Sequence, residues 1–125
     1  MKKVVNTEKA PKAIGPYSQA IEANGTLYIS GQLPIDPQTA SFVEGDAKEQ
    51  TKQVLKNIAA ILEAAGYTFD NVVKSTVLLQ SMDDFAAMNE VYASFYKNDA
   101  PARVAYQVAK LPMGALVEIE TIAVK

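Results

Sequence analysis

The sequence predicts a single α+β domain in which two helices cover one face of a mixed β-sheet. Short runs rich in β-branched residues alternate with two amphipathic stretches, giving the order β-β-β-α-β-α-β-β. A length of 125 residues, without an evident linker or internal repeat, suits one domain over residues 1–125. This order provides no third helix for the second face of the sheet, so we expect self-association through that face.

The first third of the chain contains the first three predicted strands. A short strand is expected at residues 4–5, and two more at residues 17–22 and 26–30. The last two flank Asn24-Gly25, a pair typical of hairpin turns. Residues 31–37 contain two prolines, which cannot donate to a strand ladder, so this segment is predicted to be a loop.

Two capping signals introduce the two predicted helices. Asp46 followed by Glu49 marks the start of the first helix, and Gly66 occupies the position of a C-terminal cap. Ser81 with Asp84 marks the start of the second. Their apolar faces recur at helical spacing and consist of Val54, Ile58, Ile61, Leu62 and Ala65 in the first helix, and of Phe85, Met88, Val91, Tyr92 and Phe95 in the second.

The remaining strands are predicted at residues 72–79, 103–109 and 116–124, and we expect the last two to form a C-terminal hairpin. Alternation along the last strand places Glu118 and Glu120 on one face among apolar neighbours. A carboxylate in such surroundings is costly unless it is paired, hydrogen-bonded or protonated, and shifted pKa values gather at functional sites.

Arg103 is the candidate partner for these carboxylates, since hairpin pairing would bring it opposite residues 117–123. Both Glu118 and Glu120 lie in that window. The pair could be a structural salt bridge or a charged device that protects an edge strand. Alternatively, the planar guanidinium could remain free to bind a substrate carboxylate through two parallel hydrogen bonds.

Composition excludes several kinds of site. The sequence contains no cysteine and no histidine, which removes disulfides, thiol nucleophiles, Cys/His zinc sites and histidine-based catalytic triads. Acidic residues show no calcium-loop spacing, so no metal site is expected. A net charge of −2 argues against a nucleic-acid partner, and no segment is apolar enough to enter a membrane. No signal peptide is evident, so a cytoplasmic protein is expected.

Several segments, taken in order, resemble the Rid family of reactive intermediate deaminases, also called the YjgF family. The resemblance covers nearly the whole length. The matching segments are residues 10–11 (AP), 13–20 (AIGPYSQA), 29–34 (ISGQLP), 73–77 (VKSTV), 82–85 (MDDF) with Asn89 and Tyr92, 101–103 (PAR), 108–112 (VAKLP) and 117–120 (VEIE).

The resemblance implies a chorismate-mutase-like fold and a homotrimer, in which the sheets form a central barrel and the sites lie between subunits. It implies hydrolysis of enamine and imine acids such as 2-aminoacrylate and 2-aminocrotonate to 2-keto acids and ammonia, without a cofactor. Pyridoxal-phosphate dehydratases would supply these substrates. The alternatives are a non-catalytic regulatory protein that binds small carboxylates and an RNA-cleaving protein, which the acidic charge and missing histidines disfavour.

The resemblance also implies roles for individual residues. Arg103 matches the arginine that binds the substrate carboxylate, Glu118 the acid that orients or activates water, and Tyr17 the tyrosine that closes over the ligand. The positions expected to line the cleft are Ser30, Gly31 and Asn89, together with Ala105, which stands where many members carry a cysteine and could still offer a backbone contact. Glu120 matches a position without a clear role. Thr39-Ala40 replaces a common Thr-Gly turn.

Overall fold

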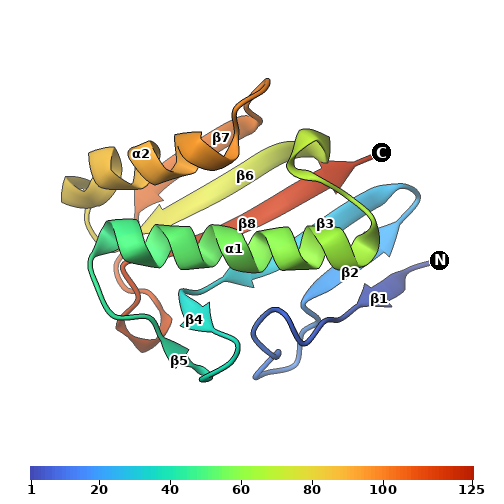
Figure 1. The fold of residues 1–125 in the computed structure, drawn as a ribbon, viewed down its shortest axis with the longest axis horizontal. Helices are drawn as coiled ribbons and strands as arrows, with labels where there is room; N and C mark the ends of the chain where they lie inside the picture. The colour runs from blue at the N-terminus through green and yellow to red at the C-terminus, as the bar shows by residue number, and fades with distance from the viewer.

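A six-stranded mixed sheet carries two helices on one of its faces (Figure 1), as the computed structural model of all 125 residues shows. The strands of the sheet are β1 (Lys3–Val5), β2 (Ala20–Ala23), β3 (Thr26–Gln32), β6 (Val72–Leu79), β7 (Ala102–Gln107) and β8 (Val117–Val124), and the helices are α1 (Ala47–Ala65) and α2 (Phe85–Phe95). Their order across the sheet is β1-β2-β3-β8-β6-β7. The predicted α+β class is confirmed.

The sheet order corrects the predicted C-terminal hairpin. β6 lies between β7 and β8, pairing in parallel with β7 and antiparallel with β8. The chain leaves β6, passes through α2 and returns beside β6 as β7, which is the crossover that parallel neighbours require. Residues 108–116 then pass the end of β6, where the Val108 amide donates to the carbonyl of Leu79 and the Gln80 amide donates to that of Leu116.

The predicted loop at residues 31–37 is also partly structured. Its first two residues extend β3 to Gln32, and β4 (Ile35–Asp36) pairs with β5 (Ser41–Phe42) in a separate two-stranded ribbon. Both prolines lie just outside β4, so neither removes a ladder hydrogen bond. Ala40 adopts the left-handed conformation, with φ of 59°. The ribbon therefore forms with alanine at a left-handed turn position.

The predicted helix signals at α1 are confirmed. The Asp46 side chain accepts hydrogen bonds from the backbone amides of Lys48 and Glu49, and Gly66 ends the helix in the left-handed conformation, with φ of 81°. At α2 the signal acts one turn earlier than expected. Ser81 caps the short 3-10 turn Met82–Asp84, and α2 itself begins at Phe85.

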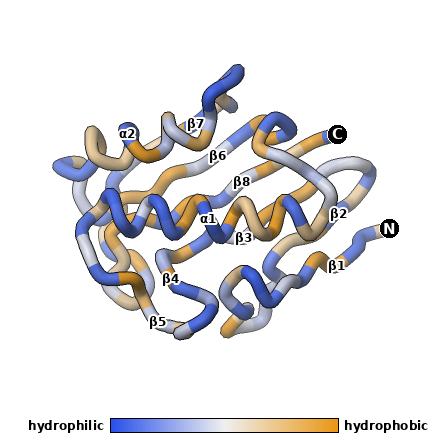
Figure 2. The backbone as a smooth tube through the Cα atoms, in the orientation of Figure 1, coloured by the Kyte–Doolittle hydropathy of each residue, from blue (hydrophilic) through white to orange (hydrophobic).

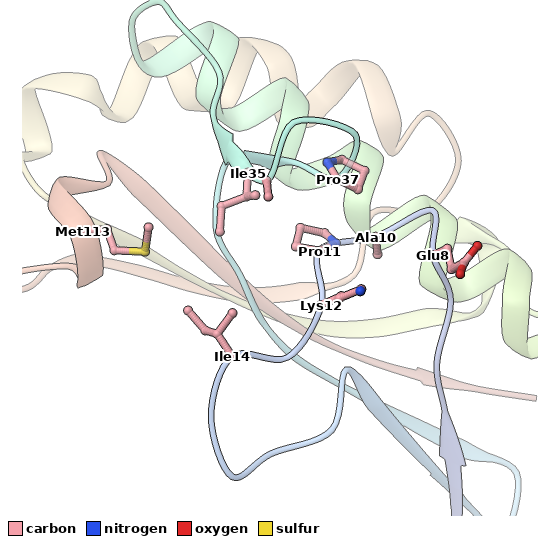
Figure 3. A pocket seen from close by; sticks show the side chains of 9 residues that line it. Glu8, Ala10, Pro11, Lys12, Ile14, Ile35, Pro37 and Met113 are labelled. Atoms are coloured by element: carbon pink, nitrogen blue, oxygen red, sulfur yellow. The ribbon is translucent and has the colours of Figure 1, made fainter.

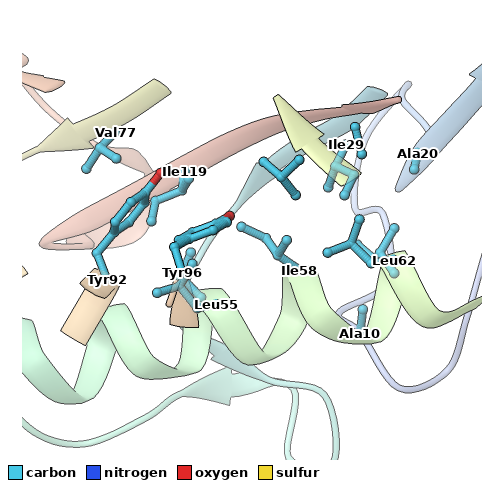
Figure 4. Packing of buried hydrophobic residues seen from close by; sticks show 14 of the residues in the cluster. Ala10, Ala20, Ile29, Leu55, Ile58, Leu62, Val77, Tyr92, Tyr96 and Ile119 are labelled. Carbon is cyan, nitrogen blue, oxygen red and sulfur yellow. The ribbon is translucent and has the colours of Figure 1, made fainter. Parts of the chain in front are cut away.

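The hydrophobic core lies between the sheet and the two helices, and each large aliphatic side chain buried there contributes about 1.5–3 kcal/mol. Hydrophobic and hydrophilic residues alternate along α1 (Figure 2), and the buried hydrophobic side of the helix faces the sheet. Figure 4 shows part of this core, which includes Leu55, Ile58, Leu62, Val77, Ile119, Tyr92 and Tyr96. Neither α1 nor α2 combines the length and the apolar composition of a membrane-spanning helix.

The face of the sheet away from the helices is open and carries exposed apolar side chains. Tyr28 is 50% exposed and Tyr106 is 47% exposed. Val4, Val104 and Val124 also show large exposed fractions on this face. Exposed apolar patches that span several strands mark interaction surfaces in soluble proteins. The expected trimer through this face stays a prediction.

Candidate active site in two half-sites

Glu118 lies on the open face of the sheet, at the edge of a cleft of about 370 Å³. Three further predicted residues, Tyr17, Ser30 and Gly31, line the same cleft, together with Ile14, Leu33 and Pro112. The strand β3 is irregular here, because its register against β8 shifts between Ile29 and Gln32. Such irregularities are common beside active sites, where they redirect side chains. Here the irregularity brings Ser30 and Gly31 to the cleft beside Glu118.

Gly31 leaves the space that the Glu118 carboxylate occupies. A Cβ atom on residue 31 would overlap the Glu118 carboxylate oxygen and approach the rest of that side chain. Gly31 has no positive φ, so its requirement for glycine here comes from this close approach rather than from backbone conformation.

Gly31→Ala is therefore expected to displace the Glu118 carboxylate. If the site acts as we propose below, a shift of about 1 Å would lower activity by roughly 100-fold. The stability loss should stay below about 1 kcal/mol, because the displaced group is the end of a flexible side chain. A double-mutant cycle with Glu118→Gln tests the coupling: the two effects should be strongly non-additive, whereas additive losses would place the effect of the alanine elsewhere.

Ser30 holds the loop that carries Tyr17. Its hydroxyl donates to the carbonyl of Ser18, and its amide donates 3.0 Å to the carbonyl of Gln19. Tyr17 lies in this loop rather than in the predicted strand, which begins only at Ala20. The Tyr17 hydroxyl accepts from the amide of Ile14 at 3.3 Å, and the side chain is 49% exposed beside the cleft. Ser30 thus holds the loop of Tyr17 through the two residues that follow Tyr17.

Gln19 is a buried support that the sequence pattern did not reveal. Its side chain is 2% exposed and accepts from the amide of Thr7 at 2.8 Å. Its amide nitrogen donates to the carbonyls of Thr7, Ala10 and Pro11 at 3.0, 3.3 and 2.8 Å. These bonds fix residues 7–11 against the base of the Tyr17 loop. A glutamine at the start of a strand carries no local signal for such a role.

Arg103 lies in a second cleft of about 340 Å³, which Asn89 also lines. Its Nη1 donates to Asn89 Oδ1 at 2.8 Å. The guanidinium carbon lies 4.9 Å from the ring centre of Tyr92 and 5.6 Å from that of Phe85. Arg103 forms no salt bridge, since the single ion pair in the chain joins Lys48 to Glu90. Its positive charge therefore has a neutral hydrogen-bond partner and no carboxylate partner.

Arg103 and Glu118 do not meet within one chain, which corrects the pairing expected from the hairpin. Arg103 is in register with Ser75 of β6, and Ser75 with Thr121 of β8; both of these are buried under the helices. Glu118 is in register with Leu78 and points to the opposite, open face. β7 is the edge strand, so the backbone around Ala105 has a ladder partner on one side only.

The environment of Glu118 raises the pKa of its carboxyl group. Half-burial in the cleft is the larger cause, because it disfavours the ionised form. The negative charge of Glu120, which lies on the same face of β8, adds to the increase. A raised pKa brings this carboxyl group closer to neutral pH, where it can both accept and return a proton.

A larger cleft lies elsewhere and contains none of the predicted site residues. It measures about 430 Å³ and lies between residues 8–14, the β4–β5 ribbon and Met113 (Figure 3). It shares only Ile14 with the Glu118 cleft. No three acidic side chains gather closely enough to hold a metal ion.

Comparison with known proteins identifies the family of this fold and these clefts. The sequence profile of the family described as Endoribonuclease L-PSP matches residues 7–125. A solved protein of the conserved Rid protein family from Yersinia pestis superposes with a TM-score of 0.98 at 51% identity, covering 100% of both chains. The chain belongs to the YjgF/Rid family. The predicted family and fold are confirmed.

Other Rid relatives align over the same full length. A RutC family protein from Pyrococcus horikoshii is 60% identical over 125 residues, covering 100% of this chain and 99% of the relative. A mouse protein named 2-iminobutanoate/2-iminopropanoate deaminase is 54% identical, covering 100% of this chain and 93% of the mouse protein. The roles assigned to Arg103, Glu118 and Tyr17 stay predictions.

Proposed function

We propose that this Rid protein hydrolyses small 2-imino acids and their enamine tautomers, such as 2-aminoacrylate and 2-aminocrotonate, to 2-keto acids and ammonia. The observation that carries the proposal is the unpaired charge of Arg103, which Asn89 holds without neutralising it. A cation kept in this way favours a planar anion such as a carboxylate. The deaminase name of the mouse relative supports the same chemistry.

Glu118 acts on water in this proposal. Its carboxylate accepts a proton from a water molecule while the water oxygen bonds to C2 of the protonated imine, and the electron pair of the C=N bond moves to nitrogen, which gives a neutral carbinolamine. Glu118 then gives this proton to the amine nitrogen. As the C–N bond breaks and ammonia leaves, the hydroxyl oxygen forms the C=O bond and its proton passes to Glu118, which releases it to solvent. Since the imine carbon is already electrophilic, fixing the substrate and one water molecule supplies much of the catalysis.

The proposed reaction requires two copies of the chain to complete each site. Arg103 faces the helix side of its sheet while Glu118 faces the open side, so the two act together when one comes from a neighbouring subunit. The exposed apolar side chains on the open face, including Tyr28 and Tyr106, supply a surface for such assembly. We therefore propose the homotrimer with sites between subunits, and light scattering measures its mass directly.

A coupled assay tests the activity. A serine or threonine dehydratase releases the enamine, and the appearance of the 2-keto acid is followed with and without the purified protein. We expect the protein to accelerate the hydrolytic step. If it binds 2-ketobutyrate but leaves the rate unchanged, the deaminase proposal is wrong and the protein is a carboxylate-binding regulator.

A further inference from the structure

One face of α2 forms a cradle for the guanidinium of Arg103. Phe85, Asn89 and Tyr92 are four and three residues apart, so they lie along one face of the helix. All three contact the same group: Asn89 through a hydrogen bond of 2.8 Å, Tyr92 and Phe85 through their ring faces at 4.9 and 5.6 Å. The side chain of Arg103 is thus held at one edge and against two aromatic faces.

The ring of Tyr92 is itself fixed in place. Tyr92 is 5% exposed, and its ring centre lies 4.6 Å from that of Tyr96, which in turn packs at 5.1 Å against Phe69. Figure 4 shows Tyr92 pointing from the helical layer toward Val77 and Ile119 of the sheet, with Tyr96 beside it. The ring of Tyr92 beside Arg103 is therefore part of the packed core and cannot move when a ligand binds.

The hydroxyl of Tyr92 takes no part in holding the guanidinium. The oxygen is buried and makes no hydrogen bond. Burial raises the pKa of Tyr92, and the nearby Ser75 hydroxyl and the charge of Arg103 offset this only in part, so the phenol stays neutral near pH 7. What Tyr92 offers Arg103 is the face of its ring, which attracts a cation without neutralising it.

We propose that Tyr92, assisted by Phe85, positions Arg103 for anion binding by fixing the guanidinium so that its free edge faces the cleft. The inference deepens the proposed function, which supplies only the identity of the anion, a substrate carboxylate. An unsupported arginine side chain must lose rotamer freedom when it binds, and a preorganised one loses less. Tyr92 is a positioning residue that acts through Arg103.

The sequence permits a direct test because Arg103 is its only arginine. The side-chain Nε–H of this residue gives a single arginine signal in a ¹H–¹⁵N NMR spectrum, and its heteronuclear NOE reports picosecond-to-nanosecond motion without any ligand. We expect an ordered Nε–H in the wild-type protein and in Tyr92→Phe, which keeps the ring. We expect a mobile Nε–H in Tyr92→Leu, and an affinity for 2-ketobutyrate lowered by about tenfold.

Two further variants separate positioning from general damage. Tyr67→Leu removes a tyrosine that is 3% exposed and does not contact Arg103, so it should lower the melting temperature while leaving the Arg103 signal ordered. Phe85→Leu, at a less buried position, should make the Arg103 Nε–H partly mobile. This variant tests the proposal if Tyr92→Leu does not fold. An Arg103 signal equally ordered in Tyr92→Leu and Phe85→Leu overturns the proposal. A wild-type protein that fails the coupled assay overturns the deaminase function instead and leaves the positioning role of Tyr92 intact.

Discussion

Arg103→Ala is expected to lower kcat/KM in the coupled deaminase assay by at least about 100-fold, because each charge-assisted hydrogen bond to a carboxylate contributes about 1.5–3 kcal/mol. In the free chain Arg103 forms one hydrogen bond, with Asn89, and no salt bridge. Its removal should therefore cost little stability, about 1 kcal/mol for the lost contacts with Tyr92 and Phe85. The thermal midpoint and the oligomer mass serve as controls for folding.

Asn89→Asp provides the matched change for this prediction. The substitution keeps the size of the side chain and the hydrogen bond to Nη1, but it gives Arg103 an internal carboxylate partner. A neutralised Arg103 should bind 2-ketobutyrate weakly, although the guanidinium itself is still present. If Arg103→Ala or Asn89→Asp retains full activity, the carboxylate-binding role of Arg103 is wrong.

The elements of this fold that are determined by residues close together in the sequence were predictable. The cap at Asp46, the C-terminal glycine at Gly66 and the apolar face of α1 act within one or two helical turns, so residue spacing reveals them. The strand β8 was equally clear, because its alternation separates buried residues from Glu118 and Glu120 on the other face. The short β4–β5 ribbon was missed because its prolines suggested a loop.

The order of the strands was not predictable in the same way. Alternation tells which face a side chain takes but not which strand lies beside it. β6 enters between β7 and β8 because α2 carries the chain back in parallel, and that path depends on how α2 packs against α1 and the core. The cradle of Arg103 was hidden for the same reason. From the sequence alone, Phe85 and Tyr92 are expected to be core residues. Their contact with Arg103 becomes visible only when α2 is placed beside β7.

Glu118→Gln is the second substitution with a large expected effect, a loss of about 100-fold or more in kcat/KM, since a positioned general base contributes about 10²–10⁴-fold. Gln keeps the shape of the side chain beside Gly31 but cannot accept the proton from water. The wild-type rate should fall as the pH drops through the raised pKa of Glu118. This places the acidic limb above the value of about 4.3 typical of glutamate.

The same raised pKa gives Glu118→Gln the opposite effect on stability. Folding favours the protonated carboxyl, so the stabilisation is present below the pKa of the unfolded chain and is lost as the pH rises through the raised folded value. At neutral pH the ionised, half-buried Glu118 is unfavourable, and Glu118→Gln should unfold at an equal or higher temperature than the wild-type protein. The difference should vanish below about pH 4. Calorimetry at both pH values measures it.

Glu120→Gln separates the two causes of the raised pKa. Glu120 is exposed and contributes the smaller, electrostatic part, while burial contributes the larger part. Removing its charge should therefore move the acidic limb of the rate profile to lower pH without abolishing activity. High salt should reproduce part of that movement in the wild-type protein, because an exposed charge is screened. If the acidic limb of the rate profile stays in place in Glu120→Gln and disappears only in Glu118→Gln, burial is the sole cause of the raised pKa of Glu118.

An unchanged rate in Glu118→Gln would instead remove this carboxylate from the chemistry.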